Sequence, residues 1–108
     1  MSTVLIYMTA GSYQEAERIG QALVQSNLAA CINILDPMHS LFWWQNEVQS
    51  EQETVLLAKS RADLVDSLTA KVRELHSYEC PCVVALPICG GNPEFIDWIQ
   101  SETQDRQE

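Results

Sequence analysis

The chain has 108 residues, 46% of them hydrophobic, which suits one domain with a single buried core. Fifteen acidic residues against six basic ones give a formal charge of −9. This balance argues against a nucleic-acid partner and against an anionic membrane partner, because both attract clustered lysine and arginine.

The N-terminal segment carries no recognisable targeting signal. "MSTVLIYMTAGS" lacks a basic n-region, and its apolar run over residues 4–8 is too short for a signal core or a membrane span. We therefore expect a cytoplasmic protein whose four cysteines stay reduced and form no disulfide framework.

The first third of the chain predicts a strand, a helix and another strand. Residues 4–9 are mostly apolar, with the β-branched side chains that strands prefer. Residues 12–15 have the S-x-x-E spacing of a helix capping box, and apolar residues then recur at helical spacing through residue 24. A second strand is expected over 30–35, closed by Asp36-Pro37.

The middle of the chain predicts a hairpin followed by a helix. Residues 40–44 and 53–60 are two extended runs, and the turn between them is expected at Gln45-Asn46-Glu47. The helix then starts within 60–63, carries one apolar stripe and ends near His76.

The last third predicts one more strand and one more helix. The strand covers 82–88. Asn92-Pro93-Glu94 offers an N-cap, a proline suited to the first helical position and an acid beside the positive end of the helix dipole. Residues 101–108 are polar and are expected to form a frayed tail, so we treat 1–108 as a single domain.

This order of elements predicts an α+β fold, a ferredoxin-like split βαβ sandwich with an antiparallel sheet and helices on one face. The other face of such a sheet is normally polar. Here three expected strands, 4–9, 53–60 and 82–88, carry apolar residues on both faces. Because the helices can cover only one face, we expect copies of the same chain to cover the other.

The hairpin supports the same expectation. Residues 41–44, "LFWW", place bulky side chains on both faces of a two-stranded ribbon. Either these side chains join the core of their own domain or the ribbon reaches onto a neighbouring subunit, and we favour the second interpretation.

Several segments resemble, in order, the CutA family of proteins named for divalent-cation tolerance. They are "LAACINI", "SLFWWQNEV", "EQETVLLAKS", "LHSYECP" and "GNPEFIDWI", and the resemblance runs from about Val4 to Trp98. It implies a ferredoxin-like homotrimer whose sheets face one another around a three-fold axis. It also implies a link to tolerance of copper and other divalent metals, with metal binding in some members and no established reaction.

The chain departs from the family pattern near its second predicted helix. It has His76-Ser77-Tyr78 where the family commonly has His-Pro-Tyr. Cys80, Cys82 and Cys89 stand where members more often carry aliphatic or acidic residues, whereas Cys31 and the histidine match family positions. A metal site built on Cys80 and Cys82 would therefore be particular to this protein and its near relatives.

Four residues are candidate metal ligands: Cys31, His76, Cys80 and Cys82. Thiolate and imidazole suit copper and zinc, and side chains two residues apart on an extended segment point the same way. The C-x-C spacing differs from the C-x₂-C of structural zinc sites and is a poor match to a known metal motif. The family resemblance implies copper or another divalent metal ion as the ligand, and we expect no metal requirement for folding. Alternatively, the cysteines are small hydrophobes and the histidine only complements a helix dipole.

A second candidate site is a cleft between subunits that contains Lys59, Tyr78 and Trp44, together with His76. Such a cleft would hold a small anion or metabolite. The trimeric architecture of the family resembles that of PII-type signalling proteins, which bind effectors between subunits. The alternative function is therefore a signalling or scaffold trimer that binds a metabolite or a protein.

Catalytic motifs are missing from the sequence. His76 could act as base for a nearby cysteine, but no Asn or Asp partner is identifiable, and "ICGGNP" lacks the lysine and spacing of a phosphate loop. We predict that the protein is not an enzyme and that it binds metal ions weakly in connection with metal tolerance.

Overall fold

The structure is a computed structural model of the chain and describes residues 2–103. Its elements are β1 (Thr3–Ala10), α1 (Tyr13–Gln25), β2 (Cys31–Trp44), β3 (Glu47–Arg61), α2 (Val65–Leu75), β4 (Val83–Pro87) and α3 (Pro93–Glu102), with a 3₁₀ turn at Ala62–Leu64. Within residues 2–103, no helix combines the length and apolar character needed to cross a membrane.

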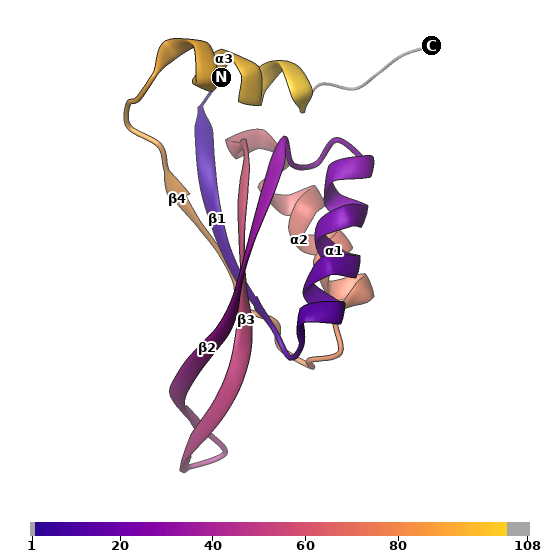
Figure 1. The fold of residues 1–108 in the computed structure, drawn as a ribbon, viewed down its shortest axis with the longest axis vertical. Coiled ribbons are helices and arrows are strands. Elements are labelled where there is room, and N and C mark those ends of the chain that lie inside the picture. Colours follow the sequence, from indigo (N-terminus) through magenta and orange to yellow (C-terminus); the bar gives the residue numbers. More distant parts are fainter. Residues whose placement is uncertain (1, 104–108) are drawn as a thin grey trace.

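The four strands form one sheet in the order β2-β3-β1-β4, and each neighbouring pair is antiparallel. Figure 1 shows α1 and α2 side by side against one face, while α3 crosses one end of the sheet. The predicted α+β fold is therefore confirmed. The prediction that all helices share one face was wrong for α3, which contacts β1 and β3 at the end of the sheet.

The core lies between the sheet and the helices α1 and α2. Ile6 of β1, Leu56 of β3 and Leu68 of α2 are each at most 1% exposed. The alternation of side chains along each strand directs one apolar set into this layer. Close approach of α1 to β2 depends on Gly20, where an added Cβ would lie 3.0 Å from Ile32 Cγ2.

Both predicted helix caps are present. Ser12 Oγ accepts a hydrogen bond from the Glu15 amide at 3.1 Å, and Asn92 Oδ1 accepts one from the Glu94 amide at 3.2 Å, with Pro93 in the first turn of α3. In a capping box, the Glu15 carboxylate would accept a hydrogen bond from the amide of Ser12, the cap residue. Here it accepts one from the Gly11 amide instead, at 3.1 Å.

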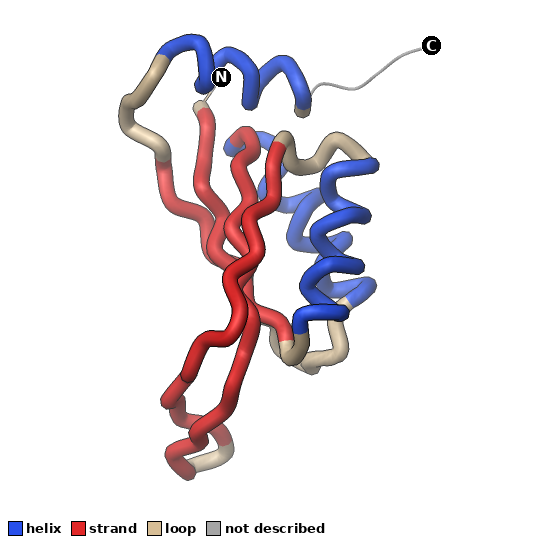
Figure 2. The backbone as a smooth tube through the Cα atoms, viewed as in Figure 1, coloured by secondary structure: helices blue, strands red, loops and turns tan. Residues whose placement is uncertain are grey.

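The strands β2 and β3 extend beyond the rest of the sheet as a two-stranded arm, residues 38–53 (Figure 2). β1 ends opposite Thr54, so the arm strands pair only with each other within the described sheet. The predicted end of a strand at Asp36-Pro37 was wrong, because the chain continues through a register shift between Leu35 and Met38. Such an irregularity accommodates proline, which cannot donate to the ladder.

The turn at the tip of the arm is formed by Gln45 and Asn46, which both have positive φ, 50° and 67°. Positive φ at both central residues is the signature of the two-residue hairpin turn that matches strand twist. The predicted hairpin is confirmed, with Trp44 and Glu47 as its closing pair.

The C-terminal tail was predicted to be frayed from residue 101 onwards. Ser101 and Glu102 instead form the last turn of α3, and Thr103 is 2% exposed. The Asn27 side chain donates to the Glu102 carbonyl oxygen at 3.0 Å. The prediction was therefore wrong for 101–103, and residues 104–108 lie outside the described part of the chain.

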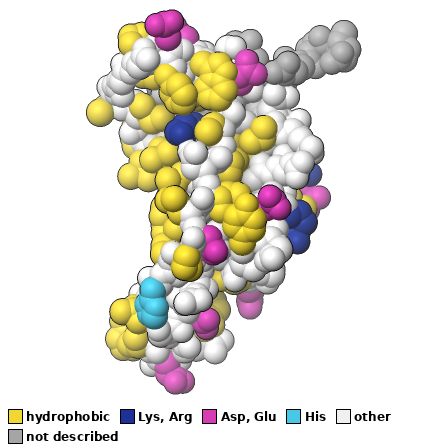
Figure 3. Space-filling model, viewed as in Figure 1, with side chains coloured by type: hydrophobic (Ala, Val, Ile, Leu, Met, Phe, Trp, Pro, Cys, Tyr) yellow, Lys and Arg dark blue, Asp and Glu magenta, His cyan; other side chains and the backbone are white. Residues whose placement is uncertain are grey.

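The face of the sheet opposite α1 and α2 is apolar, as the sequence predicted. We call it the open face. Val84 and Leu86 of β4 are 52% and 50% exposed there, directly opposite Tyr7 and Leu5 of β1. Figure 3 shows hydrophobic side chains gathered along the side of the sheet away from α1 and α2.

Candidate functional site

A cavity of about 550 Å³ lies between the arm and the loop that follows α2. Its lining comes from the arm and from that loop: Phe42, Trp44, Gln49, Glu51, Gln52, Glu53, Tyr78, Glu79, Cys80 and Cys82, with Gly11. Three carboxylates and two thiols line it, whereas none of its lining residues is a lysine or an arginine. We call it the acidic pocket.

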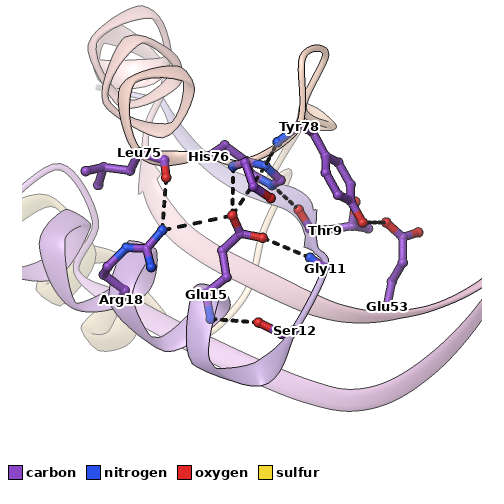
Figure 4. A network of polar contacts seen from close by, with 10 residues as sticks. Thr9, Gly11, Ser12, Glu15, Arg18, Glu53, Leu75, His76 and Tyr78 are labelled. Atoms are coloured by element: carbon purple, nitrogen blue, oxygen red, sulfur yellow. Dashed lines mark hydrogen bonds and ion pairs between the residues drawn. The ribbon is translucent and has the colours of Figure 1, made fainter.

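The loop that carries the thiols is anchored by His76, whose side chain is only 1% exposed (Figure 4). Its Nε2 lies 2.8 Å from the Thr9 carbonyl oxygen, and its Nδ1 lies 3.0 Å from the Tyr78 amide nitrogen. Because the carbonyl can only accept and the amide can only donate, Nε2 carries the proton and Nδ1 is the acceptor. Both ring nitrogens of this neutral imidazole are thus engaged by backbone groups.

Glu15 ties the same loop to the start of α1. Its Oε2 accepts from the Ser77 amide at 2.7 Å, and its Oε1 accepts from the Gly11 amide. Burial by itself raises the pKa of the Glu15 carboxyl, but the hydrogen bonds from Ser77 and Gly11 outweigh burial and hold the pKa below its ordinary value. The 3.9 Å separation from His76 Nδ1 is no ion pair, because that nitrogen carries no proton here.

Tyr78 connects the loop to the arm. Its hydroxyl donates to Glu53 Oε2 at 2.8 Å, and its ring packs 4.6 Å from the His76 ring, measured between centroids. Burial, followed by this contact with the Glu53 carboxylate, raises the pKa of Tyr78. Glu53 is 9% exposed, so a nearly buried carboxylate forms part of the pocket wall.

The two pocket thiols differ in their surroundings. Cys80 is exposed and Cys82 is half-buried, and both are free. Burial raises the pKa of the Cys82 thiol, and negative charge at Glu53 and Cys80 raises it further. The Cys82 thiol therefore keeps its proton near neutral pH, and a metal ion must displace that proton to bind.

The four predicted metal ligands do not all come together. Cys80 and Cys82 share the acidic pocket, but Cys31 lies at the start of β2, with its sulfur 3.8 Å from Lys59 Nζ. His76 is buried with both nitrogens engaged. Nowhere in residues 2–103 do three or more His, Cys, Asp or Glu side chains form a cluster able to hold a metal ion.

The predicted cleft residues are also divided. Trp44 and Tyr78 line the acidic pocket, whereas Lys59 lines a different cavity beside α3. Sequence reasoning missed Glu53 entirely and identified Glu15 only as a capping residue. No local pattern marks Glu53, because its partner Tyr78 lies 25 residues further along the chain.

Comparison with known proteins identifies the family to which this fold belongs. A family model described as "CutA1 divalent ion tolerance protein" matches residues 4–102. The chain belongs to the CutA1 family. The divalent-cation tolerance protein CutA of Archaeoglobus fulgidus is 40% identical over 99 residues, covering 92% of this chain and 96% of the relative.

The CutA1 relatives differ in length. The rice protein "CutA 1, chloroplastic" is 35% identical over 103 residues, which are 95% of this chain but 58% of the relative, so the chain spans little more than half of that protein. None of these descriptions names an enzymatic reaction.

Solved CutA structures share the fold. The A. fulgidus protein, described as periplasmic, has a TM-score of 0.91 at 39% identity, covering 94% of this chain and 99% of that one. CutA1 from Oryza sativa has a TM-score of 0.94 at 34% identity, covering 98% and 97%. These matches confirm the family resemblance and the arrangement of four antiparallel strands with three helices.

Proposed function

We propose that this CutA1-family protein binds a metal cation in the acidic pocket, as a homotrimer, and thereby contributes to divalent-cation tolerance. One observation carries the proposal: the pocket gathers two thiols and three carboxylates with no basic residue in its lining. Thiolates are ligands for soft ions such as copper, and the carboxylates attract cations to the pocket. The family description adds support at the level of divalent-ion tolerance.

Binding at this site is expected to be weak. Only Cys80 and Cys82 supply soft ligands, and the described residues organise no third ligand around them. The raised pKa of Cys82 means that a proton competes with the metal at neutral pH. Affinity should therefore rise as the pH rises toward the pKa of that thiol.

The homotrimer is supported by the open face and the arm. Leu86 and Val84 are half exposed on the open face, and Trp43 of the arm is 73% exposed. Trp43 pairs with Val48 and therefore lies on the other face of the ribbon, so apolar side chains are exposed on both faces, which is typical of surfaces that other chains cover. A cytoplasmic location belongs to the same proposal, and fractionation of cells that produce the chain tests it.

A small organic cation is the second candidate ligand. The rings of Phe42, Trp44 and Tyr78 line the acidic pocket beside its carboxylates. Aromatic faces combined with negative charge recognise organic cations. An organic cation would occupy the same acidic pocket as the metal ion, but its binding would not need the Cys80 and Cys82 thiols.

A titration of the reduced protein under anaerobic conditions tests the proposal. Cu(I) and Zn²⁺ are titrated calorimetrically into the wild-type protein and into a Cys80→Ser, Cys82→Ser double variant. The matched control is Cys89→Ser, which removes an exposed thiol that does not line the pocket. We expect wild type and control to bind alike and the double variant to bind at least about tenfold more weakly, as expected when both thiolate ligands are removed. Equal affinities in all three proteins would rule out this metal site.

A further inference from the structure

The start of the loop that follows α2 is held by two side-chain acceptors that both lose their function when they bind a proton. His76 Nδ1 accepts a hydrogen bond from the Tyr78 amide at 3.0 Å, and Glu15 Oε2 accepts one from the Ser77 amide at 2.7 Å. A protonated imidazole nitrogen is a donor and can no longer accept. Because histidine is the side chain whose charge ordinarily changes between about pH 5 and about pH 8, the contact between His76 and Tyr78 is the first that a falling pH can break.

The protonated form of His76 has a second set of partners available in the same place. Its Nε2 donates to the Thr9 carbonyl oxygen at 2.8 Å in either charge state. A proton on Nδ1 would face Glu15 Oε2, which lies 3.9 Å away. Pairing with that carboxylate offsets the cost of a charge on a side chain that is only 1% exposed. Both N–H groups of the imidazolium thus find acceptors, and the Tyr78 amide is the group that loses its partner.

Two charged side chains of α1, Glu15 and Arg18, lie beside His76 (Figure 4). Arg18 lies 4.0 Å from Glu15 Oε2, but its side chain is 60% exposed and donates to the Leu75 carbonyl oxygen at 3.1 Å. Water screens so exposed a guanidinium, whereas the Glu15 side chain is only 8% exposed. The pKa of Glu15 lies below its ordinary value, so the carboxylate is charged wherever a histidine titrates. The negative charge therefore dominates the surroundings of His76.

Tyr78 connects His76 to the arm. Its ring packs 4.6 Å from the His76 ring between centroids, and its hydroxyl donates to Glu53 of β3, at the base of the arm. Tyr78 and Glu53 are the titratable groups on this side, and β1 presents an uncharged group, the Thr9 carbonyl oxygen. All of these contacts lie within one chain, and His76 and Glu15 are nearly buried in it. The arrangement is therefore complete however copies of the chain associate.

We propose that His76 is a pH-dependent anchor for the loop of residues 76–82. The neutral ring holds the Tyr78 amide. The protonated ring pairs with Glu15 instead and releases that amide, which loosens the contact between the loop and the arm. Neither form leaves a ring nitrogen free for a metal ion, so this anchor does not depend on the proposed metal site.

Amide hydrogen exchange of the full, metal-free protein, followed by NMR between about pH 7.5 and about pH 5, tests the proposal. We expect the protection factor of the Tyr78 amide to fall at least about tenfold over this range, as expected when one hydrogen bond is lost. The His76 amide donates to the Val72 carbonyl oxygen at 2.8 Å at the end of α2, and its protection should stay constant. Nitrogen-15 spectra of the imidazole should show Nδ1 gaining its proton over the same pH interval.

The matched variant is His76→Asn, because an asparagine side chain can also accept from the amide two residues further on but does not titrate. Its Tyr78 amide should be equally protected at both ends of the pH range. His39→Asn is the control: it removes the other histidine of the chain, which lies on the arm 2.8 Å from Ser50 Oγ, and should behave like the wild type. Glu15→Gln removes the charge that pairs with the imidazolium and should move the release of Tyr78 to lower pH.

Four results would overturn the proposal. They are an Nδ1 that stays unprotonated down to about pH 5, protonation of Nδ1 without loss of protection at Tyr78, an equal loss of protection in His76→Asn, and release at an unchanged pH in Glu15→Gln. Circular dichroism verifies that His76→Asn is folded. Should it not be, the wild-type protein decides, because the midpoint of Nδ1 protonation must coincide with the midpoint of Tyr78 release.

Discussion

The two faces of the sheet carry similar side chains in different surroundings. On the face covered by α1 and α2, Ile6 and Leu56 are at most 1% exposed, whereas Val84 and Leu86 on the open face are about half exposed. The covered face stabilises the fold of the single chain through burial of apolar area. The open face contributes little to that fold, so its apolar side chains are available for association.

The acidic pocket and the cavity beside α3 both include residues of the open face, because Glu53 and Lys59 lie on the same face of β3. Leu5 and Lys59, which line the cavity beside α3, are directly opposite one another on β1 and β3. Leu86 lies on the same face, because it pairs with Leu5 from the neighbouring strand β4. The covered face is thus used for stability, whereas the open face carries residues of both cavities.

The largest effect should come from a charge on the open face. Leu86→Glu places a carboxylate opposite Leu5, at a position that is buried if copies of the chain cover this face. An unpaired buried carboxylate costs several kcal/mol, so we expect self-association to be lost while the chain stays folded.

Sedimentation and circular dichroism measure these two outcomes. Val24→Glu is the control, because Val24 is 39% exposed on α1, on the other side of the molecule. A Leu86→Glu protein that associates like the wild type would contradict the division of roles between the faces.

Truncation of a core leucine should have the next largest effect. Leu56→Ala leaves a cavity under α1 and α2 and should lower the free energy of unfolding by about 2–5 kcal/mol. Leu86→Ala removes the same atoms from the open face and should cost less than about 1 kcal/mol in dilute, dissociated protein. Urea unfolding at low protein concentration compares the two, and equal losses would remove the distinction.

A smaller effect is expected from Glu15, with a definite pH dependence. The pKa of Glu15 is lower in the folded chain than its ordinary value of about 4.5. Its contribution is therefore fully present above about pH 4.5 and is lost as the pH falls through the lower folded pKa. Glu15→Gln should cost about 1–3 kcal/mol at pH 7 and progressively less in acid.

Urea unfolding between pH 7 and pH 3 measures this trend. Glu17→Gln changes an exposed acid on the same helix and serves as control. A destabilisation by Glu15→Gln that does not shrink toward acid pH would show that charge at this position is irrelevant.

The smallest effect should come from Tyr78→Phe. It removes the hydroxyl that donates to the Glu53 carboxylate and should cost about 1.5 kcal/mol, the lower end of the range for a hydrogen bond to a charged group. Denaturant unfolding measures the loss of unfolding free energy. The reference is Tyr13→Phe, because the Tyr13 side chain on α1 is exposed. If both substitutions have the same effect, the contact between loop and arm adds nothing to stability.

Most of the fold could be predicted because its signals are local. The caps at Ser12 and Asn92 depend on residues two or three positions away. The continuity of β2 could not be predicted, because Asp36-Pro37 resembles a strand end unless a partner strand is present. That partner, β3, accommodates the proline beside a register shift.

The candidate sites show the same limit. Cys80 and Cys82 were expected to lie together because they are two residues apart, and both line one pocket. The sequence could not show that Lys59 and Trp44 lie in different cavities, because the position of Lys59 depends on strand register. Lys59 pairs with Cys31, at the opposite end of β2 from Trp44. The anchoring role of His76 depends on Thr9, which is 67 residues away.

The pairing within the arm, residues 38–53, restricts how the length of the arm can change. Its strands pair residue by residue, Leu41 with Ser50 and Trp43 with Val48, and successive side chains alternate between the faces. Removal of one residue from each strand would turn every side chain beyond the deletion to the opposite face. Only the removal or insertion of two residues per strand preserves the faces, so the reach of the arm can change only in steps of about 7 Å.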